Sequence, residues 1–152
     1  MLKVAIVMGS DSDMPIAEKA AATLKEFGIA CDIKVISAHR NPNKIRLFAR
    51  NAREQGVGVI IAIAGLAAHL PGVVASMTLL PVIGVPGGSG PLSGLDALYS
   101  IVQMPGGIPV ACVGIDNAKN GALLAVQMLS LAEPSLFDKM AAYRRKFGDD
   151  AD

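Results

Sequence analysis

The sequence is poor in aromatic residues and in charge. Its 152 residues include no Trp, two Tyr and four Phe, so a platform of aromatic side chains that stack on nucleic-acid bases is not expected. Charged residues make up 18% of the chain and the formal net charge is +1. Proteins that bind a phosphate backbone carry a basic patch, so nucleic acid is excluded as a partner. Hydrophobic residues make up 52%, too many for a disordered chain.

Charge is absent from one long internal segment. No Asp, Glu, Lys or Arg lies between Glu54 and Asp96. A membrane-spanning helix is not expected there, because His69 and Pro71 end the apolar run before it reaches the roughly 20 residues that a span needs. We interpret the low charge as apolar surface that further copies of the chain cover, which predicts a homo-oligomer.

Cysteine and histidine are also rare. Cys31 and Cys112 stand alone in apolar surroundings, which favours small buried residues over a disulfide. The two cysteines and two histidines show no ligand spacing, so no metal site is predicted. The N-terminal residues run directly into a strand pattern without a signal peptide, and we therefore expect a cytoplasmic protein.

Short apolar runs alternate with amphipathic segments along the whole chain. The predicted strands are 4–8, 31–37, 57–64, 82–85 and 110–115. The predicted helices are 15–27, with Asp13 as its cap, 42–55, 71–79, 95–104, 117–131 and a last one after Pro134, followed by a frayed acidic tail over 148–152. This alternation predicts one α/β domain over residues 1–152, with a doubly wound parallel sheet of about five strands.

Polar residues follow the first three predicted strands. They occupy 9–13, 37–40 and 67–72, and they include Arg40 and both histidines of the protein. In doubly wound sheets, ligands bind beyond the carboxyl ends of the strands. We therefore expect these three segments to meet at one site.

Each segment also has a structural interpretation. Residues 9–13 are either a turn with helix-capping side chains, or a cradle in which serine hydroxyls and amides hold a phosphate while Asp13 suits sugar hydroxyls. His39 and Arg40 either cap the next helix or bind an anion, which would offset the unfavourable interaction of an arginine with a helix N-terminus. His69 is either a buried neutral histidine or a site residue. The Gly-rich segment 87–90 could be only a flexible loop.

Four motifs in order carry a resemblance to a known family. They are Val-Met-Gly-Ser-Asp-Ser-Asp at 7–13, Ser-Ala-His-Arg at 37–40, Ala-Ala-His-Leu-Pro-Gly at 67–72 and Leu-Tyr-Ser-Ile-Val-Gln-Met-Pro at 98–105. The chain resembles the class I N5-carboxyaminoimidazole ribonucleotide mutases of purine biosynthesis from Val4 to about Arg145. The resemblance implies a flavodoxin-like three-layer α/β/α domain that assembles as a homo-octamer and uses no cofactor.

The resemblance also implies roles for single residues. His39 would be the catalytic acid–base in a reaction that moves a carboxylate from a carbamate nitrogen to carbon 4 of the imidazole. The substrate would be a small nucleotide, and a separate ATP-dependent synthetase would make the carbamate. The residues expected to bind the substrate are Gly9, Ser10, Ser12, Asp13, Ser37, Arg40, Ala68 and His69.

The chain departs from the family pattern at two places. Leu66 stands where the family usually has Gly, and Gly87-Gly88-Ser89 replaces a segment of the type Val-Gln/Glu-Ser. Leu66 is expected to narrow the pocket or to tilt the loop of His69. A second class of the family carboxylates aminoimidazole ribonucleotide directly with CO2 and typically has Ser-Ala-His-Lys, so Arg40 points away from it. The alternatives are this direct carboxylation and a non-catalytic module that binds a phosphate ester.

Overall fold

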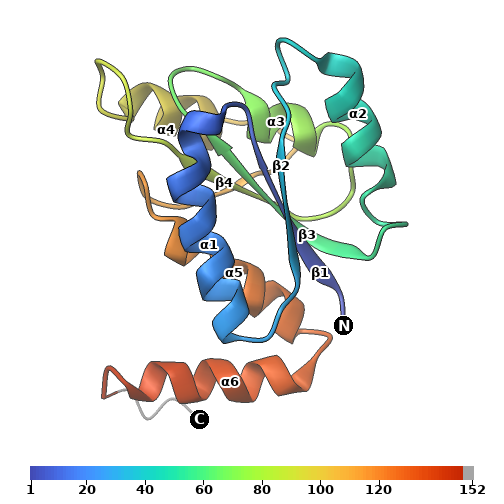
Figure 1. Cartoon of the computed structure of the whole chain (residues 1–152), viewed down its shortest axis with the longest axis vertical. Coiled ribbons are helices and arrows are strands. Elements are labelled where there is room, and N and C mark those ends of the chain that lie inside the picture. The colour runs from blue at the N-terminus through green and yellow to red at the C-terminus, as the bar shows by residue number, and fades with distance from the viewer. Residues whose placement is uncertain (149–152) are drawn as a thin grey trace.

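The computed structural model describes residues 1–148, in which strands and helices alternate (Figure 1). The strands are β1 (Lys3–Met8), β2 (Cys31–Val35), β3 (Val57–Ala64), β4 (Val82–Pro86) and β5 (Ala111–Cys112). The helices are the short 3-10 turn η1 (Asp11–Asp13), α1 (Met14–Glu26), α2 (Pro42–Asn51), α3 (Leu70–Ala75), α4 (Leu95–Val102), α5 (Ala118–Ser130) and α6 (Pro134–Arg145).

The five strands form one parallel sheet in the order β2-β1-β3-β4-β5. This is the flavodoxin-like order, with its switch point between β1 and β3. Met8 pairs with Val35 of β2 and with Ile63 of β3, so these three strands end at the same level. The predicted fold class is confirmed, and the loops after β1, β2 and β3 leave the sheet side by side.

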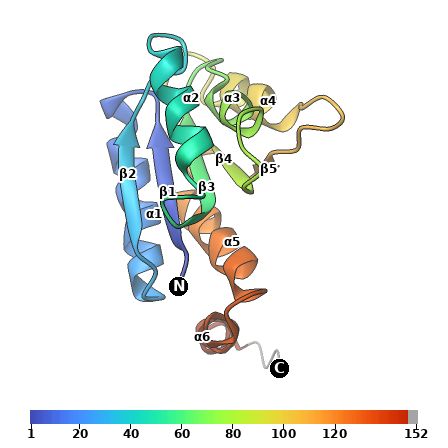
Figure 2. The ribbon, with the colours of Figure 1, turned by 90° about the vertical axis from the view of Figure 1, so that its right-hand side faces the viewer.

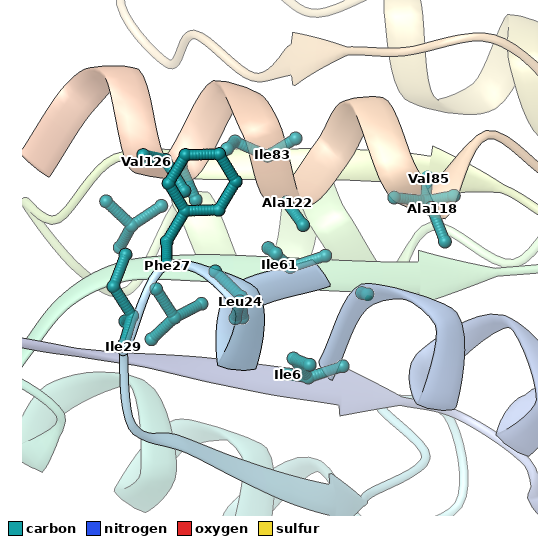
Figure 3. Packing of buried hydrophobic residues seen from close by; sticks show 14 of the residues in the cluster. Ile6, Leu24, Phe27, Ile29, Ile61, Ile83, Val85, Ala118, Ala122 and Val126 are labelled. Carbon is teal, nitrogen blue, oxygen red and sulfur yellow. The ribbon is translucent and has the colours of Figure 1, made fainter. Parts of the chain in front are cut away.

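Helices cover both faces of the sheet, which gives three layers (Figure 2). Side chains alternate along β1, so Ile6 packs on the face of α1 and α5 while Ala5 and Val7 pack on the face of α2, α3 and α4. Figure 3 shows the first of these cores, where Leu24 of α1 and Val126 of α5 meet the strands. The central strand β3 is buried on both faces, as expected for a parallel sheet.

Several turns and helix starts carry the residue types that their backbone geometry favours. Gly28 (φ +74°) and Gly56 (φ +80°) end the turns after α1 and α2 in the left-handed conformation that favours glycine. The side chain of Asn41 accepts a hydrogen bond from the Lys44 amide at 3.2 Å and caps α2. Asp13 occupies the predicted cap position of α1 but makes no capping hydrogen bond, because its carboxyl group is buried beside other loops.

Several predicted boundaries were too long. β2 ends at Val35 instead of residue 37, and β5 contains only Ala111 and Cys112 instead of 110–115. Both are edge strands, so the pairing of each depends on a single neighbour. Helix α3 ends at Ala75, where Ser76 bonds back to the Val73 carbonyl. Of the predicted tail, residues 149–152 lie outside the described residues.

The segment without charge is mainly the interior of the chain itself. It contains β3, α3 and β4, whose side chains fill both cores. Its low charge is therefore explained without a second subunit. Cys31 and Cys112 are free thiols that are only partly buried, and this burial raises the pKa of both. No helix within residues 1–148 is long and apolar enough to cross a membrane.

Candidate functional site

A cavity of about 430 Å³ opens at the carboxyl ends of the strands. It lies at the switch point of the sheet, where this fold binds ligands. Four loops contribute to it, and the lining residues are Gly9, Ser10, Ser12, Asp13, Ser37, Ala38, His39, Arg40, Ala64, Gly65, Leu66, Ala68, Leu70 and Ser89. Two larger cavities lie elsewhere, one between α5 and α6 and one beside the segment that follows α3, but neither is lined by a histidine or a carboxylate.

The loop after β1 forms the first wall. The Ser10 hydroxyl accepts a hydrogen bond from the Ser12 amide at 3.3 Å and another from the Ser12 hydroxyl at 3.0 Å. These bonds close the η1 turn just before α1. The two hydroxyls therefore lie together at the start of a helix, where anions are favoured.

Asp13 is the buried carboxyl group of this wall, with 6% of its surface exposed. Burial raises its pKa above the ordinary value, and the negative charge of Asp116 raises it further. A carboxyl group in this position holds a proton more readily than one in water. It can therefore donate a hydrogen bond to a ligand oxygen when it is protonated, and accept one when it is ionised.

The loop after β2 folds back onto the loop after β1. The Ser37 hydroxyl accepts a hydrogen bond from the Arg40 amide at 3.2 Å, and Nη2 of Arg40 donates to the Gly9 carbonyl at 3.3 Å. Within residues 1–148, no carboxylate forms an ion pair with Arg40. His39 and Arg40 are both exposed and both line the cavity, so an imidazole and a guanidinium group without a carboxylate partner in residues 1–148 stand next to each other.

The loop after β3 forms an apolar wall. Leu66 has φ +53°, a backbone conformation that L-residues rarely adopt, and 54% of its surface is exposed. Its side chain lies over Gly90, since a Cβ atom on Gly90 would stand 2.6 Å from Leu66 Cδ2. Leu66 therefore contacts the loop after β4, and its predicted effect, a narrower pocket or a tilted loop of His69, stays a prediction.

His69 is placed differently from the other predicted residues. It immediately precedes α3, and its ring lies against Gly72 in the first turn of that helix. Ala68 and Leu70 line the cavity, whereas His69 and Ala67 are not among its lining residues in the described part of the chain. The substrate-binding role of His69 stays a prediction.

The structure thus brings together Gly9, Ser10, Ser12, Asp13, Ser37, His39, Arg40 and Ala68. Ala38 and Leu70 lie within the segments 37–40 and 67–72 that were expected to meet at the site, whereas sequence reasoning missed the lining by Ala64 and Gly65 and treated Ser89 only as part of a flexible loop. Their signal was weak, because small apolar residues at strand ends are common. In residues 1–148 no three His, Cys, Asp or Glu side chains cluster as metal ligands would.

The sheet order and this cavity define an α/β protein with a candidate ligand site at the switch point of its sheet, where a histidine and an arginine lie together. The profile of the AIR carboxylase family matches residues 3–150, and the chain belongs to this family. The N5-carboxyaminoimidazole ribonucleotide mutase of Pyrococcus abyssi is 58% identical over 144 residues, which cover 95% of this chain and 83% of that protein. The mutase of Thermotoga maritima is 54% identical over 96% of this chain and 85% of its own length.

Solved structures agree with the sequence comparison. The crystal structure of Treponema denticola PurE superposes with a TM-score of 0.89 at 34% identity, over 97% of this chain and 92% of that one. A similar protein from Vigna aconitifolia, the chloroplastic phosphoribosylaminoimidazole carboxylase, is 51% identical over 91% of this chain, which spans 25% of that longer protein. The family expected from the four motifs is confirmed.

Proposed function

We propose that this chain is an N5-carboxyaminoimidazole ribonucleotide mutase, which forms 4-carboxy-5-aminoimidazole ribonucleotide in purine biosynthesis. The mutases that it resembles are 54–58% identical over most of the chain. The observation that carries the proposal is the cavity in which His39, Arg40 and Asp13 meet at the switch point of the sheet. Residues 1–152 are taken as one mutase domain, since a single sheet carries both cores.

The reaction breaks the bond between the carbamate nitrogen and the carboxyl carbon and forms a bond between that carbon and carbon 4 of the imidazole. Protonation of the carbamate nitrogen allows its bond to the carboxyl carbon to break, which releases CO2. The electron-rich carbon 4 of the imidazole then attacks this CO2 and forms a carbon–carbon bond, and the proton on carbon 4 is removed to restore the aromatic ring. His39 is the proposed group for both proton transfers, because an imidazole ring can both donate and accept a proton. No cofactor is required by this sequence of steps.

Substrate binding is assigned to the two polar loops. Arg40 has no carboxylate partner in the described residues and lies beside the start of η1, so it suits the phosphate of the nucleotide. Ser10, Ser12 and Ser37 offer hydroxyl groups around it. Asp13 suits the ribose hydroxyls, which both donate and accept hydrogen bonds.

The apolar wall suits the intermediate. The apolar part of the cavity lining comes from the end of β3 and the loop after it, and consists of Ala64, Leu66, Ala68 and Leu70. Free CO2 has no net charge and is held better by an apolar, water-poor wall than by polar groups. We therefore propose that CO2 formed from the carbamate is kept in the cavity until carbon 4 attacks it.

The test is an ultraviolet assay with the purified protein and the carbamate nucleotide, without ATP or bicarbonate. We expect conversion to the carbon-4 carboxylate, and labelled bicarbonate in the medium should enter the product slowly compared with turnover. Product formed only from aminoimidazole ribonucleotide and dissolved CO2 would instead show direct carboxylation. Binding of the nucleotide without turnover at any pH would show a non-catalytic module.

Assembly as a homo-oligomer, and specifically an octamer, is part of the proposal. Large apolar side chains remain exposed outside the site, among them Leu79 (100%), Leu131 (90%) and Phe147 (74%). Such side chains are often covered in an assembly. Light scattering should give a mass of several chains at micromolar concentration, and a stable monomer would contradict this. Functional coupling to the carbamate-forming synthetase and a cytoplasmic location stay predictions.

A further inference from the structure

The loop between β4 and α4 reaches the cavity through one side chain. Ser89 lines the cavity, and the segment before it is fixed by two hydrogen bonds of consecutive amides. The Gly87 amide donates to the Ala64 carbonyl at 2.8 Å, and the Gly88 amide donates to Oδ1 of Asp116 at 2.7 Å. The first bond continues the pairing of β4 with β3, whereas the acceptor of the second bond, Asp116, lies 28 positions later in the chain.

Asp116 holds this loop from behind the cavity. Its own amide donates to the Pro86 carbonyl at 2.8 Å, so Asp116 contacts the backbone on both sides of Gly87. Its φ of +58° turns the carboxylate towards Gly88, in a conformation that Asp tolerates better than most residues do. Asp116 is not a lining residue of the cavity and is outside the substrate contacts proposed above.

Two glycines of this loop, Gly88 and Gly90, lie where neighbouring side chains leave little space for a side chain. A Cβ atom on Gly88 would collide with the Asp116 carboxylate, and a Cβ atom on Gly90 would stand 2.6 Å from Leu66 Cδ2. A side chain at position 88 would compete with the Asp116 carboxylate for space, and one at position 90 would displace the end of the Leu66 side chain.

We propose that Asp116 is a positioning residue of the mutase reaction, which holds the Ser89 hydroxyl at the substrate cavity through the Gly88 amide. This inference rests on the proposed function for the identity of the substrate. Without the hydrogen bond to the Asp116 carboxylate, the Gly88 amide is free to donate to water, and Ser89 must be ordered when the substrate binds. Substrate binding is therefore weakened, and KM changes more than kcat, because the variant disturbs the loop of Ser89 and leaves His39, the proposed proton-transfer group, in place.

The test compares four variants in the mutase assay. Asp116→Gly keeps the left-handed backbone but removes the acceptor, and we expect KM to rise about 3- to 10-fold with kcat within about twofold. Asp116→Asn keeps an acceptor oxygen and should restore KM to within about twofold of the parent value. Ser89→Ala should raise KM to a similar extent as Asp116→Gly. The double variant should be no worse than the more affected single variant, since both changes remove the same contact.

A control and a second measurement separate this inference from the proposed function. Ser93 lies in the same loop and is also left-handed (φ +54°), so Ser93→Gly should leave KM unchanged. Hydrogen exchange of residues 87–90 in the free protein should be faster in Asp116→Gly than in the parent and in Asp116→Asn. Unchanged KM and exchange in Asp116→Gly, or equal damage in Asp116→Asn, would overturn the inference. A parent without mutase activity would overturn the proposed function, and exchange would still decide whether Asp116 holds the loop.

Discussion

Leu66 offers a test of backbone strain at the site. A left-handed conformation costs an L-residue roughly 1–2 kcal/mol, and glycine adopts it without this penalty. Glycine in turn loses about 0.5–1 kcal/mol more conformational free energy on folding. At φ +53° the first effect is the larger one, so Leu66→Gly should be more stable than Leu66→Ala by about 0.5–1 kcal/mol. In ordinary loops the order of the two variants is reversed.

The comparison with the parent follows from burial. Leu66 is 54% exposed, so somewhat less than half of its apolar surface is protected from water. Full burial of a leucine contributes about 1.5–3 kcal/mol, and removal of the side chain here should therefore cost about 1 kcal/mol. The free energy of unfolding of Leu66→Ala should be lower than that of the parent by that amount. The free energy of unfolding of Leu66→Gly should lie within about 0.5 kcal/mol of the parent value, because relief of strain offsets the lost contact.

Urea unfolding of the variants at one protein concentration measures these differences. Leu92 is the matched control, since it is 57% exposed and is not among the described residues with positive φ. There, the glycine variant should be less stable than the alanine variant by about 0.5–1 kcal/mol. If glycine is also the less stable of the two at position 66, the strain argument is refuted.

Three further predictions concern the polar walls. His39→Asn should retain substrate binding and lose turnover by about 10²- to 10⁴-fold, and a loss below about tenfold in kcat would contradict its role as the acid–base. Arg40→Ala should raise KM by about 10- to 150-fold and affect kcat less, and an unchanged KM would place the phosphate elsewhere. Asp13→Asn should be more stable than the parent at neutral pH, because the raised pKa of Asp13 means that its ionisation destabilises the fold. Urea unfolding should show this advantage shrinking as the pH falls through the raised pKa of Asp13 towards the ordinary aspartate value of 3.8, and it should be gone below 3.8, where Asp13 is protonated in both states; an advantage that is independent of pH would contradict the assignment.

Burial on both faces decides how well each strand could be predicted. β3 was predicted at its observed bounds, and β1 and β4 to within one residue at one end, since their continuous apolar runs are unlike any loop. The predicted ends of β2 and β5 were wrong, because the length of an edge strand is decided by its pairing with a single neighbouring strand. No local pattern in the sequence records that limit.

The site was predictable where it follows the strands and hidden where it depends on tertiary contacts. Ser10, Ser37 and Ala68 follow strand ends, so the alternation of strands and helices alone places them at one edge. The contact of Asp116 with Gly88 joins two loops that no motif connects. The left-handed conformation of Leu66 was also hidden, since its residue type favours a different backbone conformation.

The two edges of the sheet treat left-handed residues differently. In residues 1–148, the connections that lead from a helix to the next strand place glycine at each such position, namely Gly28, Gly56 and Gly107. In the same part of the chain, the edge that carries the cavity has left-handed glycines, Gly90 and Gly94, but also the non-glycine residues with positive φ, namely Leu66, Ser93 and Asp116, which follow β3, β4 and β5. The buried carboxyl group of Asp13 lies at the same edge. At Leu66 and Asp116 the unfavourable conformation belongs to a side chain that lines the cavity or holds one of its loops, so a glycine there would relieve strain only by removing that side chain.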